Sequence, residues 1–234
     1  MSETASIPTS KPPGTTSLFS RLTNMLVSPG YVFDEVARSP HRVFNWVLPI
    51  VLVSLASLLL LASATNKQQV SDQIRGLVNN ETITSAQAEK MSSTWDRSSV
   101  LAVLSTAVTG TFWSALVIWS IGRFLLKSPF SLFKGLEVVG LAGVIVAVGA
   151  LITAALVGAL GDAAARPALS LFASQAPADA PLRLVLDVFN VFHLWTTTVL
   201  AIGLSRLSRV SLKEASFWVF GYWVVARIAL TVLS

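Results

Sequence analysis

An apolar run of about 22 residues, from Val43 to Ala64, carries no charged side chain. A helix of that length rises about 30 Å, which is the thickness of the hydrocarbon core of a bilayer. Such a helix would not be stable with its surface in water, so we predict that the run crosses a membrane. The composition agrees, because 53% of the chain is hydrophobic and only 12% is charged, about half the charged share of a soluble domain.

Four further apolar segments follow the first one. None of them alternates in polarity with the period of two that a membrane β-barrel requires. We therefore predict an all-α fold, a polytopic membrane helix bundle with about five transmembrane helices. The fourth and fifth segments are weaker in hydropathy, because charged side chains interrupt them. The predicted spans are residues 43–64, 100–124, 137–160, 184–204 and 215–233.

Lysines and arginines near the span ends are unevenly divided between the two sides. Ten fall on the side of the N-terminus and six on the other. Because basic loops are retained in the cytoplasm, we predict a cytoplasmic N-terminus and an outer C-terminus. The short loops 125–136 and 205–214 are almost purely basic. They are the predicted contact surface for a partner or for lipid, through Lys127, Lys134, Arg206 and Arg209.

Three segments lie outside the predicted spans. Residues 1–16 are rich in Ser, Thr and Pro and are predicted to be a disordered tail. Residues 17–42 are predicted to form cytoplasmic or interfacial amphipathic helices. The first lies either in the membrane interface or against the bundle, with Arg21 on its polar side. Residues 65–99 are predicted to form an outer helical hairpin, in which Thr84 to Gln87 fits a capping box.

Four polar side chains lie in the two weakest predicted spans. Asp187, Asn190 and His193 follow one another at intervals of three, so they share one face of a helix. Arg227 in the fifth span lies at a depth from which its long side chain can reach Asp187. We predict that the four form one buried polar cluster between adjacent spans. A structural role and a transport role both remain open.

No constellation for catalysis, for a cofactor or for a metal ion is present in the sequence. The chain has no cysteine, and His41 and His193 lie far apart without a carboxylate at metal-ligand spacing. Gly140, Gly143 and Gly149 lie within an apolar span and lack the Lys-Ser/Thr ending of a phosphate loop. The pI of about 10 arises in juxtamembrane loops, where anionic lipid explains it better than nucleic acid does. We therefore predict a protein that is not an enzyme and binds no nucleic acid.

Several short motifs stand in a characteristic order along the chain. They are Ser28-Pro29 with Phe33-Asp34-Glu35-Val36, the stretch from Asp187 to Trp195, Gly203-Leu204, and Ser211-Leu212-Lys213-Glu214-Ala215 before the last span. In this order they resemble the Yip-domain family of multi-pass membrane proteins, over roughly residues 18–234. The resemblance implies five spans with a cytoplasmic N-terminus. The family's eukaryotic members act around the Golgi and the endoplasmic reticulum and bind Rab-type GTPases, so a eukaryotic origin would imply those membranes.

The chain departs from the eukaryotic pattern, because the Asp-Leu-Tyr-Gly-Pro stretch is absent. Binding of a Rab-type GTPase is therefore not supported, and the chain looks more like the compact prokaryotic members. That resemblance implies a location in a bacterial cytoplasmic membrane. Two function classes remain. We favour a non-enzymatic membrane scaffold or interaction protein, whose partners are the bilayer and another membrane or peripheral protein. The alternative is a transporter or channel for a small solute or ion, although five spans do not divide into the two equal halves of an inverted repeat.

Overall fold

The computed structural model describes residues 17–173 and 181–233. Within these ranges every regular element is a helix, and extended backbone pairs only in an isolated bridge between Ala168 and Asn190. The predicted disordered tail, residues 1–16, lies outside the described residues. The all-α class is therefore confirmed for the part of the chain that the structure describes.

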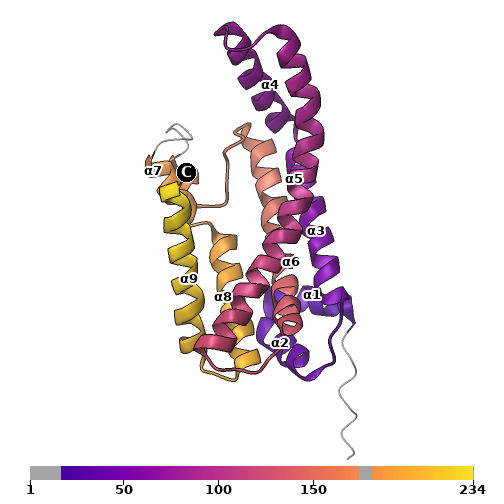
Figure 1. The fold of residues 1–234 in the computed structure, drawn as a ribbon, viewed down its shortest axis with the longest axis vertical. Helices are drawn as coiled ribbons and strands as arrows, with labels where there is room; N and C mark the ends of the chain where they lie inside the picture. The colour runs from indigo at the N-terminus through magenta and orange to yellow at the C-terminus, as the bar shows by residue number, and fades with distance from the viewer. Residues whose placement is uncertain (1–16, 174–180, 234) are drawn as a thin grey trace, which may run out of the picture.

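Five long helices run side by side in alternating directions (Figure 1). They are α3 (Phe44–Leu61), α5 (Ser85–Ser120), α6 (Leu132–Leu160), α8 (Val191–Ser208) and α9 (Leu212–Leu233). Among the described residues, α3, α6 and the continuous helix formed by α5 with the π-helical turn η1 (Ile121–Leu125) are long and apolar enough to cross a membrane. Helices α8 and α9 fall outside that set, so the predicted count of about five spans is supported for three.

A helical hairpin projects beyond the bundle at the end away from the N-terminus (Figure 1). It consists of α4 (Ala64–Asn79) and the first turns of α5. The predicted capping box is confirmed, because the Thr84 hydroxyl accepts from the Gln87 backbone and the Gln87 side chain accepts from the Thr84 backbone. The helix that begins there runs without a break into the apolar span. Residues predicted as a separate hairpin arm and a separate span therefore form one helix.

The fourth predicted span, residues 184–204, is not one helix. It is divided into α7 (Pro181–Val188) and α8, with Asn190 between them. The Asn190 side chain accepts from the backbone N–H groups of Phe192 and His193, which begins α8 with an N-cap. The backbone N–H of Val191 donates to Pro167 of the preceding loop. These bonds favour a new helix start over continuation of α7.

The two N-terminal helices, α1 (Leu18–Val27) and α2 (Pro29–Arg38), pack against the bundle (Figure 1). Leu22 and Met25 of α1 and Phe33 of α2 belong to one buried core with residues of α6 and α8, and partly buried residues of α3 pack against it. Helix α1 therefore packs against the bundle, and its place in the membrane interface stays a prediction. The polar side assigned from periodicity is wrong in one respect, because Arg21 is 1% exposed.

Helices α3 and α6 approach each other closely at a glycine. A methyl group at Gly140 would lie 2.4 Å from the Cα and Cβ atoms of Trp46, so only glycine fits there. Gly149 meets the ring of Phe192 in the same way, at 2.8 Å. Small residues in α6 thus let neighbouring helices come near enough for dispersion contacts to stabilise the bundle.

Candidate functional site

The N-terminal part of α6 carries a carboxylate with no exposure to solvent, Glu137. Its Oε1 accepts from the backbone N–H of Arg42 at 2.5 Å and from the Asn45 side-chain amide at 3.1 Å. The Nδ1 atom of His41 lies 3.6 Å from the same oxygen. A carboxylate this deep in an apolar core is tolerated only because hydrogen-bond donors surround it.

Lys134, one turn before Glu137, points into the same cluster. Its ammonium lies 2.8 Å from Glu137 Oε2 and donates to the carbonyl oxygens of Val36 at 2.7 Å and Ser39 at 2.8 Å. These three acceptors match the three protons of a lysine ammonium. Ser131 caps the start of α6 by accepting from the Lys134 backbone, which sets the register that turns both charges inward.

A second ion pair extends the cluster toward the N-terminus. Arg21 donates to Glu35 at 2.5 Å and to the Asn45 side-chain oxygen at 3.3 Å. Asn45 therefore connects the two pairs, because it accepts from Arg21 and donates to Glu137. We call these five residues, Arg21, Glu35, Asn45, Lys134 and Glu137, the polar clamp.

The polar clamp joins three consecutive N-terminal helices to a fourth, α6, whose contacts with them span more than 90 residues of sequence. Arg21 lies on α1, Glu35 on α2, Asn45 on α3, and Lys134 and Glu137 on α6. The backbone groups that it binds, at Val36, Ser39 and Arg42, lie at the end of α2 and in the connection to α3. Removing Lys134 would leave the buried charge of Glu137 without its ion-pair partner, which costs about 3–5 kcal/mol. The arrangement therefore holds α1 and α2 in one position on the bundle.

The four residues predicted as a buried polar cluster are only partly brought together. The Arg227 guanidinium lies 2.8 Å from His193 Nδ1, which must be the acceptor because an arginine can only donate. Asp187 accepts from the Ser170 hydroxyl, and Asn190 caps α8. Asn190 is buried, Asp187 and Arg227 are half-buried, and His193 is exposed. Direct coupling of Asp187 to Arg227 stays a prediction.

The four basic residues predicted as a contact surface do not all lie on the surface. Lys127, Arg206 and Arg209 are exposed at the N-terminal end of the bundle, and Arg206 lies 3.7 Å from Asp34 on α2. Lys134 is different, because its side chain is 15% exposed and its ammonium is bound inside the polar clamp. Lys134 is therefore not available to a partner. Its neighbours along the sequence suggested an exposed loop, but α6 begins at Leu132 and turns it inward.

The chemistry open to these sites is limited. Among residues 17–173 and 181–233, no group of three or more His, Asp or Glu side chains is placed to hold a metal ion. The polar clamp pairs its acidic and basic groups with one another, so its geometry suits holding helices together more than proton transfer to a substrate.

Sequence reasoning missed the polar clamp, although it named Arg21 and Lys134 in other roles and began a predicted span at residue 137. A signal was present, because charges at positions 134 and 137 lie one helical turn apart beside an apolar block. Their partners at Arg42 and Asn45 lie more than 90 residues away. Periodicity along one helix carries no information on which distant helix supplies them.

Comparison with known proteins gives one match. The family model described as the Yip1 domain matches residues 23–234, nearly the whole chain. No curated protein and no solved structure matches it. The matched range includes α2 and the five long helices, and it begins within α1.

Proposed function

The chain belongs to the Yip1 domain family, and on this premise we propose that it is a non-enzymatic scaffold of a membrane. Its apolar helices and its family support a role in a membrane. In our proposal it organises lipids or a partner protein and performs no chemical reaction, in keeping with a family that is not known as enzymatic.

The polar clamp is the observation that carries this proposal. A transport path needs polar groups that exchange partners with a solute, whereas Glu137 and Lys134 are bonded to each other and to fixed backbone groups. Their contacts hold α1 and α2 as a platform at one end of the bundle. Such a platform, bordered by exposed basic side chains, fits the binding of a partner or of anionic lipid.

We propose that the platform faces the cytoplasm, in a topology of five spans. The alternating directions of α3, α5, α6, α8 and α9 support this topology (Figure 1), as does the excess of basic residues at the N-terminal end. Single cysteines at positions 127 and 90 of this cysteine-free chain test it. In intact cells an impermeant thiol reagent should label position 90 only. Labelling of position 127 would overturn the topology.

Charge reversal at the platform tests the scaffold function. Lys127, Arg206 and Arg209 changed together to Glu should abolish co-purification of crosslinked partners or the retention of anionic lipid. The matched control reverses Arg75, Lys90 and Arg97, which are exposed on the distant hairpin, and should leave recruitment unchanged. Recruitment that survives the first triple change, in protein shown to be inserted and folded, would contradict the platform assignment.

A transporter or channel is the second candidate, and the Arg227–His193 contact is the observation that favours it. These two polar groups meet between otherwise apolar helices. Purified protein in liposomes should show no solute or ion flux above that of empty liposomes. Reproducible flux that is lost on changing Arg227 or His193 would replace the scaffold proposal.

A further inference from the structure

Two hollows adjoin along α3 and α5. The first, which we call the cleft, has a volume of about 540 Å³ where α3, α4 and α5 meet. The second, which we call the groove, has a volume of about 500 Å³ and lies between α3, α5, α6 and α8. Leu58 lines the cleft and the adjacent Ser57 lines the groove, so one hollow leads to the other.

The two hollows differ in charge, because Lys67 lines the cleft and no charged residue is among the described residues that line the groove. The cleft is bordered by the ammonium-bearing side chain of Lys67 and by the hydroxyl side chains of Ser71, Ser92 and Ser99. The walls of the groove are mainly aliphatic, from Val53, Val103, Val139, Val146 and Leu200. The change occurs near Val100, where the apolar block of the sequence begins. A ligand that fits both hollows has a polar head and an apolar tail.

The groove has the length of one hydrocarbon leaflet. It extends along α5 from Ala102 to Ser114, which is about 18 Å at 1.5 Å per residue, against about 15 Å for half of a hydrocarbon core. Gly110 lies on its wall, and a methyl group there would meet nothing within 4 Å. This glycine therefore does not serve close packing of helices. The Thr196 hydroxyl in the same groove is buried and has no partner among the described residues.

The positive charge of Lys67 in the cleft favours an anionic lipid head group. Lys67 takes part in no ion pair among the described residues, and the described side chains that line the cleft include no carboxylate. Trp95 contributes an amphipathic ring to the same wall, a side chain that favours the head-group region of a membrane. A cation at this level attracts the phosphate of an anionic lipid.

We propose that the cleft and the groove together bind one anionic phospholipid, with its head group at Lys67 and an acyl chain along Gly110. A soluble anion would use the cleft alone, and an uncharged hydrocarbon would use the groove alone. A phospholipid fits both hollows, because it joins a charged head group to an apolar acyl chain. The cleft, where the head group binds, is separate from the basic platform, which lies at the opposite end of the bundle.

Lipid retention by the full-length protein tests the proposal. Protein in mild detergent is equilibrated with equal amounts of phosphatidylglycerol and phosphatidylcholine, and the bound lipids are counted by native mass spectrometry. One phosphatidylglycerol should be retained per chain in preference to phosphatidylcholine. Lys67→Gln should reduce that preference about fivefold, the effect of one cation near a membrane surface. Gly110→Leu should reduce retention of both lipids, because the new side chain occupies the groove.

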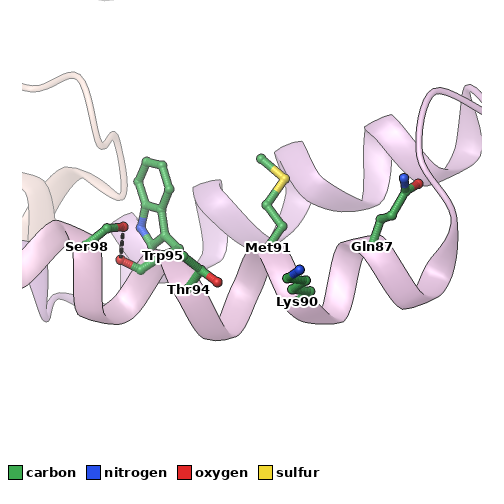
Figure 2. Close-up of a pocket in the computed structure, with 6 residues that line it drawn as sticks. All are labelled: Gln87, Lys90, Met91, Thr94, Trp95 and Ser98. Atoms are coloured by element: carbon green, nitrogen blue, oxygen red, sulfur yellow. Dashed lines mark hydrogen bonds between the residues drawn. The ribbon is translucent and has the colours of Figure 1, made fainter.

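Two control variants match these changes. Lys90 lies on the stretch of α5 drawn in Figure 2, within two turns of Trp95, and does not line the cleft. Lys90→Gln should leave the preference unchanged. Gly158 of α6 has as much free space as Gly110 but does not line the groove, so Gly158→Leu should leave retention unchanged. Thermal unfolding verifies that each variant is folded.

Three results would overturn the proposal. Equal retention of the two lipids by the unchanged protein would show that no head group is recognised. Equal effects of Lys67→Gln and Lys90→Gln would show that the preference for phosphatidylglycerol arises from general surface charge and not from the cleft. Full retention by Gly110→Leu would show that no acyl chain lies in the groove.

Discussion

Removal of Lys134 from the polar clamp should destabilise the protein more than removal of both Lys134 and Glu137. Lys134→Met keeps the aliphatic stem but leaves the Glu137 carboxylate, which has no exposure, without its counter-ion. We expect a loss of about 3–5 kcal/mol. For a chain of this length that corresponds to a fall in Tm of about 6–20 °C, at about 2–4 °C per kcal/mol.

Adding Glu137→Gln should restore part of this loss. The glutamine oxygen can still accept from the backbone N–H of Arg42 and from Asn45, as Oε1 does now, while the buried charge is gone. Glu137→Gln alone should cost less than Lys134→Met, because the ammonium keeps the carbonyl groups of Val36 and Ser39. The sum of the two single losses in unfolding free energy should exceed the loss in the double variant by about 1–3 kcal/mol.

Thermal unfolding in detergent, followed by tryptophan fluorescence, measures the four proteins of this cycle. Hydrogen exchange shows which part of the protein is destabilised. Protection of backbone amides should be lost first in α1 and α2, which the polar clamp holds. A double variant no more stable than Lys134→Met would refute the argument. So would strictly additive losses, since they would mean that the two charges act independently.

Three further outcomes follow from the packing. Gly140→Ala should lower stability by about 1–3 kcal/mol, because its methyl group would meet α3 at 2.4 Å, whereas Gly158→Ala has open space and should be neutral or stabilising; equal melting temperatures would contradict this. Arg21→Met should cost about 3–5 kcal/mol and expose α1 to hydrogen exchange, and a change below about 1 kcal/mol would mean that its two polar contacts hold nothing. Arg227→Ala and His193→Ala should each lower the Tm, and their double variant should lose less than the sum; simple addition would rule out coupling across the 2.8 Å contact.

The apolar blocks predict the long helices well, because each block must satisfy its own backbone hydrogen bonds within a membrane. They predict helix ends less well. Asn190 lies inside an apolar block, yet its side chain caps α8 and divides the predicted span. The cap depends on two backbone N–H groups two and three residues away, together with a loop contact to Pro167. An asparagine in a helix interior and one at a helix start look alike in hydropathy.

The candidate sites were predicted from residue type. Residue type gives the charge of a side chain but not whether that side chain points into the bundle or toward solvent. Lys127 and Lys134 lie in one basic stretch of sequence, and only the first is exposed. Arg21 was assigned to the polar side of its helix, and the structure buries it because Glu35 and Asn45 supply acceptors. In both cases the deciding partner comes from another helix. The choice between an outward and an inward charge is made at the level of tertiary packing.

The uninterrupted course of α5 sets how the hairpin can change in evolution. At 3.6 residues per turn, one residue inserted between Ser85 and Val100 would rotate everything before it by about 100° about the helix axis. The α4 helix and its side of the cleft would then face elsewhere. Only the connection between Asn79 and Ser85 lies outside the helices of the hairpin, so changes in length are tolerated there. Relatives of this chain should vary in loop length at that tip and keep the spacing along α5.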